Sequence, residues 1–180
     1  DMRLYVSVAS LSPLDVRLSR RWLARAAPVA YAAVPLGDPA THMTVTKYNG
    51  LAQTVWPAEL VMAHPCLASS WGATWARVRE ALATTFGQLA ARADLDSPFA
   101  RGRCRALYGV DMLLAEGADW REPAAPAQTA VTSPQPVLLE VNYSPDLESV
   151  LALYPRFVDE LFCNLFERAG PAGSEDAWER

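Results

Sequence analysis

Cysteine and histidine are scarce in this sequence, and neither is clustered. The chain of 180 residues contains three cysteines, Cys66, Cys104 and Cys163, and two histidines. The cysteines lie far apart, their number is odd and no Cys-x-x-Cys pair occurs, so the sequence indicates neither a disulfide framework nor a zinc site. We therefore expect a protein of a reducing compartment, and we place it in the cytoplasm.

An excess of positive charge and a long hydrophobic run are also missing. The formal net charge is −4, so bulk binding of nucleic acid is not expected, and a phosphate site would have to be built locally from a few arginines. No apolar run reaches the roughly 18 residues that a membrane-spanning helix needs. With 51% hydrophobic and 20% charged residues, the chain has the composition of a globular protein with no nucleic-acid and no membrane partner.

The sequence lacks an initiator methionine and opens directly in DMRLYVSV, which has the pattern of an ordered strand. We therefore expect the chain to be part of a longer protein. Residues 3–10 are rich in β-formers and alternate between two faces. One face is apolar (Leu4, Val6, Val8) and the other is mixed (Arg3, Tyr5, Ser7), which predicts a strand covered on one face only.

Apolar periodicity predicts two helices. In SSWGATWARVREALATTFGQLAAR, with Ser69 or Ser70 as N-cap, apolar residues recur every three or four positions and predict a core-facing stripe: Trp71, Trp75, Val78, Leu82, Phe86 and Leu89. A second amphipathic helix is predicted from about Pro155, with Phe157, Val158, Leu161, Phe162 and Leu165. Residues 14–31 stay open between a short helix and a second strand with a turn, and residues 34–50 are predicted as mostly loop.

Two apolar runs each contain a single acid. RALYGVDMLLAE contains Asp111, and VLLEVNYSP contains Glu140. Both runs read as buried strands, and the Pro-rich stretch between them, residues 116–136, is predicted to be a flexible insertion loop. Loop-closure entropy grows only slowly with length, so this insertion can join two paired strands. We infer an antiparallel pair.

The acids of these two strands predict a shared site. Residues i and i+2 of a strand point to the same face, so Glu140 and Asn142 project together, with Asp111 available across the pair. Hard oxygen donors of this kind are what Mg²⁺ uses in nucleotide enzymes, and the ion would offset two like charges. A buried carboxylate needs a partner, however, and an arginine or nearby water would serve as well. Spacing alone leaves both readings open.

These residues resemble the tubulin-tyrosine ligase-like family. The strings YGVDMLL and LLEVNYSP are similar to its G-x-D-x-x-L and L-L-E-V-N-x-S-P motifs, and DMRLYV is similar to its D-x-R-x-Y-V strand. Arg25, Ala27 and Tyr31 match an R-x-A-x-x-x-Y pattern, and HMT at 42–44 matches the start of H-x-T-N. The resemblance implies an α+β fold: an ATP-grasp-like C-terminal lobe with a mainly antiparallel sheet flanked by helices.

The resemblance also implies roles for individual residues. Asp111, Glu140 and Asn142 would be the Mg²⁺ ligands and, with Arg25, would hold ATP. Arg25 would contact the γ-phosphate, and Arg25 and Glu140 would be the catalytic pair. Guanidinium suits phosphate because its planar fork meets oxygens bidentately.

The implied reaction is ATP-dependent ligation, in which a carboxylate becomes an acylphosphate and an amine displaces the phosphate. The acceptor would be tubulin or another acidic protein tail, and the second substrate an amino acid. Asp1 and Arg3 would contact the acceptor peptide or phosphate. A cytoplasmic, cytoskeleton-associated protein is implied.

Several positions carry weaker or opposing signals. Val45 stands where the family usually has asparagine and Ala106 where it usually has an acid, and both losses bear on nucleotide or substrate binding. Lys47 could contact a phosphate or an acidic tail, or simply be solvated. His42 matches the family pattern but could be structural, and His64 is treated as structural.

The domain assignment follows from the extent of the resemblance. Residues 1–168 are assigned to the C-terminal portion of an ATP-grasp domain and residues 169–180 to a disordered tail. The upstream lysines and adenine-binding strands of such a domain are not in this sequence. Two functions therefore stay open: part of a working ligase, or a degenerate pseudo-ligase that binds tubulin, nucleotide or regulatory partners.

Overall fold

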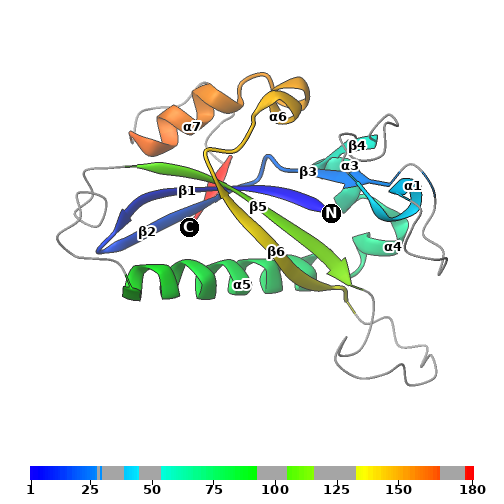
Figure 1. Cartoon of the computed structure of the whole chain (residues 1–180), viewed down its shortest axis with the longest axis horizontal. Coiled ribbons are helices and arrows are strands. Elements are labelled where there is room, and N and C mark those ends of the chain that lie inside the picture. The colour runs from blue at the N-terminus through cyan, green and yellow to red at the C-terminus, as the bar shows by residue number, and fades with distance from the viewer. Residues whose placement is uncertain (28, 30–38, 45–53, 93–104, 116–132, 167–176) are drawn as a thin grey trace.

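The computed structural model describes residues 1–27, 29, 39–44, 54–92, 105–115, 133–166 and 177–180. These residues form a seven-stranded sheet whose strand pairs are all antiparallel, with helices on both faces (Figure 1). The α+β fold, with a mainly antiparallel sheet flanked by helices, is therefore confirmed.

Strand β1, Met2–Leu11, is the centre of the sheet. Along one edge it pairs first with β3, Leu23–Ala26, and then with β2, Leu14–Ser19. Its other edge pairs with β5, Ala106–Ala115, which in turn pairs with β6, Gln135–Tyr143. The open assignment of residues 14–31 is thus resolved for its described part in favour of strands, and the predicted antiparallel pairing of the two acid-containing strands is confirmed.

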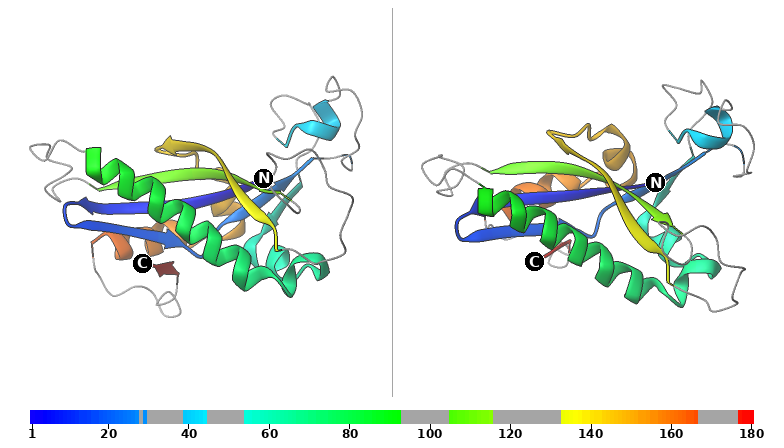
Figure 2. Two further views of the ribbon diagram at one scale, coloured as in Figure 1. Left: turned by 90° about the horizontal axis from the view of Figure 1, so that it is seen from below. Right: turned by 60° about the horizontal axis from the view of Figure 1, so that its bottom comes forward.

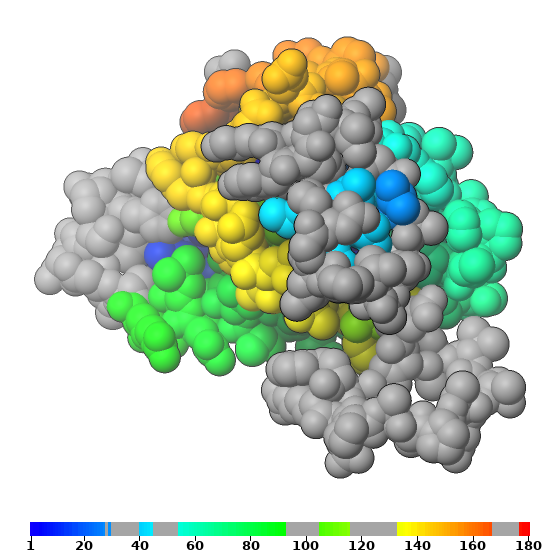
Figure 3. All heavy atoms as spheres, turned by 45° about the vertical axis from the view of Figure 1, so that its right-hand side comes forward, coloured from blue at the N-terminus to red at the C-terminus, as the bar shows by residue number. Residues whose placement is uncertain are grey.

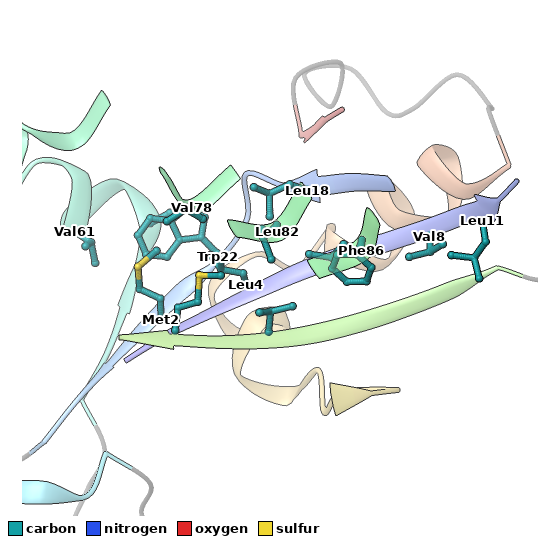
Figure 4. Packing of buried hydrophobic residues seen from close by; sticks show 14 residues of the cluster. Met2, Leu4, Val8, Leu11, Leu18, Trp22, Val61, Val78, Leu82 and Phe86 are labelled. Carbon is teal, nitrogen blue, oxygen red and sulfur yellow. The ribbon is translucent and has the colours of Figure 1, made fainter. Parts of the chain in front are cut away.

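Helix α5, Trp71–Arg92, covers one face of the sheet (Figure 2). Figure 4 shows Val78, Leu82 and Phe86 reaching from α5 toward β1, and each is at most 4% exposed. Trp71 and Trp75 stack on the buried Trp22, which confirms the predicted core stripe. Its last member is the exception: Leu89 is exposed, because Ala90, four residues after Phe86, takes the inward position.

Helices α6, Glu148–Leu153, and α7, Phe157–Leu165, cover the opposite face (Figure 1). The predicted second helix is thus present, but α7 begins after Pro155, and α6 precedes it. The rings of Tyr5 and Phe157 lie 4.9 Å apart between sheet and helices, and both residues are fully buried. The prediction that residues 3–10 are covered on one face only is therefore wrong, because α6 and α7 bury the second face of β1 as well.

The remaining elements gather at one end of the sheet. They are α1, Pro39–His42, β4, Thr54–Pro57, α3, Ala58–Met62, and α4, Pro65–Ala68. Strand β4 pairs with β3 and extends the sheet beyond it. The side chain of His64 accepts a hydrogen bond from the backbone nitrogen of Cys66 and caps α4, in agreement with its structural assignment.

The last four residues are ordered against the sheet. Strand β7, Trp178–Glu179, pairs with β2, and the indole Nε1 of Trp75 donates to Glu179 at 2.8 Å. The predicted disordered tail is therefore wrong for residues 177–180, because a buried Ala177 and these polar contacts anchor them. Residues 169–176 lie outside the described part, as do residues 116–132 of the predicted insertion, whose residues 135 and 136 already belong to β6.

Candidate functional site

The ladder between β5 and β6 places the two strand acids opposite each other. Asp111 pairs with Glu140, and Gly109 pairs with Asn142. Residues directly opposite in an antiparallel pair share one face of the sheet, so Asp111, Glu140 and Asn142 share a face. The register shifts directly after Asp111, and such bulges occur often beside active sites. The predicted juxtaposition of these three residues is therefore present.

Strand β6 is not buried, contrary to the prediction. Leu139 and Val141 are 48% and 38% exposed, and Glu140 is exposed between them. Within the described residues β6 pairs with β5 alone, which makes it an edge strand, and its residues lie at the surface in Figure 3. Glu140 therefore does not need the buried partner that the sequence suggested. Instead its Oε1 accepts a hydrogen bond of 2.7 Å from Nδ2 of Asn142.

Asp111 is the buried half of the arrangement. It is 4% exposed, and Arg3, its neighbour across β1 and β5, donates Nε and Nη2 to its two oxygens, the latter at 2.7 Å. Arg25 of β3 adds a bond of 2.9 Å from Nη2 to Oδ2. Burial alone would raise the pKa of Asp111, but the bonds from Arg3 and the charge of Arg25 outweigh it, so the pKa lies below its usual value. Asp111 is thus ionised at neutral pH.

Arg25 is itself held by Asp1. Its Nε and Nη2 donate to the two carboxylate oxygens of Asp1 at 2.9 and 2.6 Å, and the side chains are 12% and 9% exposed. Its backbone nitrogen also donates to the carbonyl of Asp1 at 2.8 Å. Two arginines and two aspartates therefore form one bonded cluster on the face that carries Glu140. The contact between Asp1 and Arg25 was not anticipated from sequence, because it depends on β3 folding back beside the start of β1.

The donor set fits a hard divalent cation. A carboxylate has about four lone-pair sites, and the two arginines use three on Asp111, so one is left. Glu140 adds an exposed carboxylate and Asn142 an amide oxygen, which are donors that Mg²⁺ accepts. In the described part of the chain no three His, Cys, Asp or Glu residues group into a metal site, and the donor set on this face has two carboxylates and one amide. The alternative reading, pairing with arginine, describes Asp111 in this structure.

Ala106, one of the residues that depart from the family pattern, does not lie on the face that carries Asp111. Ala106 pairs with Val8 on the face covered by α5, opposite to that of Asp111, and is 4% exposed. An acid at this position would point away from Glu140 and Asn142. Ala106 therefore does not lie on the face that carries the candidate site. Val45 and Lys47 lie outside the described residues.

The comparisons with known proteins cover nearly all of the chain. The model of the tubulin-tyrosine ligase family matches residues 1–177. Tubulin-tyrosine ligase-like protein 12 of Caenorhabditis briggsae is 26% identical over 177 residues, which are 92% of this chain and 24% of that protein. The chain thus spans about a quarter of the length of this relative. No helix within the described ranges is long and apolar enough to cross a membrane.

The two acid-containing motifs that resemble the family lie on neighbouring strands of the sheet. Both acid-containing motifs lie on β5 and β6, paired in register, and the family match runs through both. This family comprises ATP-grasp ligases that modify tubulin and generally use ATP and Mg²⁺. From the extent of the match and the arrangement of its motifs, the chain belongs to the tubulin-tyrosine ligase family.

Proposed function

We propose that this chain carries the metal- and phosphate-binding groups of an ATP-dependent carboxylate-amine ligase that adds an amino acid to tubulin or a similar acidic protein. The supporting observation is the pairing of Asp111 with Glu140 across β5 and β6, on the face where Arg3 and Arg25 also converge. Anionic and cationic groups so close together suit a ligand that contains both a cation and phosphates.

In this proposal Asp111, Glu140 and Asn142 hold Mg²⁺. When bound, the ion would neutralise charge on the nucleotide phosphates and so stabilise the transferring group. Glu140 and Asn142 are already adjacent and hydrogen-bonded, so they need little rearrangement to serve one ligand. Asp111 keeps its ionised state through its arginine partners, and an ionised carboxylate is what a cation requires.

Arg25 is the proposed γ-phosphate contact. Asp1 accepts hydrogen bonds from Nε and Nη2 of its guanidinium, which fixes the plane of the group before any ligand binds. A group held in position in advance loses less conformational entropy when it binds, so this pairing favours phosphate recognition. Arg3 is held in the same way on Asp111 and is the proposed contact to the acceptor peptide or phosphate.

A pseudo-ligase is the second candidate, and one feature favours it. Arg3 and Arg25 already compensate the charges of Asp111 and Asp1 within the chain. The cluster is therefore satisfied without a cation and could persist as a structural remnant in a protein that binds tubulin or a regulatory partner. Val45, in place of the usual asparagine, points the same way.

The two candidates differ in what the full-length protein does with nucleotide and amino acid. Calorimetry would measure Mg-ATP binding, and a labelled amino acid would report incorporation into tubulin. Glu140→Gln removes a proposed metal ligand, whereas Glu148→Gln makes the same change at an exposed position in the first turn of α6.

The ligase predicts binding and incorporation that fail in Glu140→Gln and persist in Glu148→Gln. Mg-ATP binding without incorporation would support the pseudo-ligase. Equal incorporation by wild type and Glu140→Gln would refute the role of Glu140.

A further inference from the structure

Gly109 occupies a crowded position on the face of the sheet that carries the candidate site. It lies in β5 between Tyr5 of β1 and Asn142 of β6, two residues before Asp111. A Cβ atom at Gly109 would lie 2.7 Å from Cβ of Pro145 and 3.3 Å from Cγ of the same ring. Real Cβ atoms do not approach other carbons so closely, so the position accepts Pro145 only because it is glycine.

Pro145 reaches this position because the chain turns sharply at the end of β6. Ser144 has a φ of 52°, in the left-handed region that residues with a side chain seldom adopt. Its backbone nitrogen donates to the carbonyl of Leu107 at 3.2 Å, which ties the turn to β5. Such a conformation persists only where the surroundings determine it, and it occurs often at functional sites. The turn is thus held down on the sheet rather than projecting from its edge.

The same space is shared by the stem of Arg3. Cδ of Arg3 would lie 3.3 Å from a Cβ atom at Gly109. The Pro145 ring and the aliphatic part of Arg3 therefore both lie over Gly109, while the guanidinium of Arg3 continues to Asp111. Any atom added at Gly109 must displace the ring, the arginine or both.

We propose that Gly109 and Pro145 are positioning residues for the candidate site: the proline ring, seated on the glycine, fixes the stem of Arg3 and the strand end that carries Asn142. This inference rests on the proposed function. It also links the sequence strings YGVD and NYSP, because Gly109 of the first string leaves the space that Pro145 of the second fills. Neither residue touches the reacting atoms; each acts through Arg3 and Asn142.

The test is a double-mutant cycle in the full-length protein. Gly109→Ala adds the clashing atom, Pro145→Gly removes the ring, and the double variant contains the added atom without the ring. Gly87→Ala in α5 is the matched control, because a Cβ atom there meets nothing within 4 Å. Two quantities are measured: the Kd of Mg-ATP, and hydrogen exchange in the peptide that contains the Ser144 amide, which reports opening of the turn.

We expect Gly109→Ala to weaken Mg-ATP binding about tenfold or more, because a displacement of about 1 Å in a site can cost about 100-fold. It should also speed exchange at Ser144. In the Pro145→Gly background the same alanine should cost much less in both measurements, because only the approach to Cδ of Arg3 at 3.3 Å is left. Gly87→Ala should match the wild type.

Equal Mg-ATP affinity in Gly109→Ala and Gly87→Ala would overturn the inference, and so would fully additive effects in the cycle. If the wild type binds no Mg-ATP, the proposed function fails by itself. The hydrogen-exchange measurement then tests the inference by itself. Faster exchange at Ser144 in Gly109→Ala, with a smaller increase when the alanine is added to Pro145→Gly, supports packing of the turn on Gly109. Unchanged exchange in Gly109→Ala refutes that packing.

Discussion

The two faces of strands β1 and β5 differ in what their side chains contribute. Toward α5 these strands present mainly apolar residues, and they pack into one core cluster that includes Met2, Leu4, Val6, Val8, Val110 and Met112. Toward α6 and α7 the same strands present Tyr5 in an apolar cluster but Arg3 and Asp111 in a charged one. Alternation along a strand thus separates two environments by the thickness of one backbone.

We therefore expect the α5 face to contribute mainly to stability and the opposite face to contribute mainly to ligand binding. The α5 face buries an apolar cluster, so a change there should affect the free energy of unfolding and leave the charged cluster in place. The site face holds ionised groups whose burial is offset only by their mutual bonds, so a change there should affect charge balance first. The two faces can therefore be perturbed independently.

The largest effect on stability is expected from Phe86→Ala on the α5 face. Phe86 is 1% exposed and packs edge-on against Tyr108 at 5.5 Å between ring centroids. Removing the ring leaves a cavity and should lower the free energy of unfolding by about 3–5 kcal/mol, measured by urea denaturation. Leu89→Ala, on the same helix but 41% exposed, should cost less than about 0.5 kcal/mol. Similar costs for both variants would show that the α5 face is not the packed one.

A smaller loss is expected from Asp111→Asn on the site face. The substitution keeps the shape of the side chain but removes the charge that Arg3 and Arg25 share. Hydrogen bonds to charged groups contribute about 1.5–3 kcal/mol, so we expect a loss of about 2 kcal/mol in the same denaturation experiment. A gain in stability would mean that the desolvation of Asp111 exceeds its pairing energy, and the contrast between the faces would then be one of function only.

The pH dependence of the free energy of unfolding should also differ between variants of the two faces. The pKa of Asp111 is lower in the folded chain than in the unfolded one, so its contribution is present at neutral pH and is lost as the pH falls below about 4. The stability difference between wild type and Asp111→Asn should therefore shrink across that range. Asp15, whose pKa is lowered by its bond to Arg17, contributes equally to both proteins and cancels. Phe86→Ala should keep a constant difference from wild type, and a shrinking one would contradict the assignment.

Much of the architecture was predictable because local signals agreed with the fold. The periodic stripe of α5 and the alternation in β1 each have one dominant physical cause, which is burial of apolar side chains. The pairing of Asp111 with Glu140 was also predictable, since two similar acid-containing runs joined by a long loop suit an antiparallel ladder.

The errors arose where burial depends on elements distant in sequence. VLLEVNYSP resembles a buried strand, yet β6 is an edge strand, and composition alone cannot tell which strand ends a sheet. The same holds for Tyr5, whose cover comes from Phe157 of α7. The arginine partners of Asp111 were missed as a cluster for the same reason: Arg3 and Arg25 come from two other strands.

The smallest effect on stability is expected from Glu140→Gln, although Glu140 faces Asp111 directly. Glu140 is exposed, and its bond with Asn142 can be replaced by water, so the free energy of unfolding should change by less than about 0.5 kcal/mol. Asp111→Asn is the matched comparison, because it makes the same chemical change on the opposite strand at 4% exposure. A loss above about 1 kcal/mol in Glu140→Gln would show that Glu140 belongs to the bonded cluster rather than lying open toward a ligand.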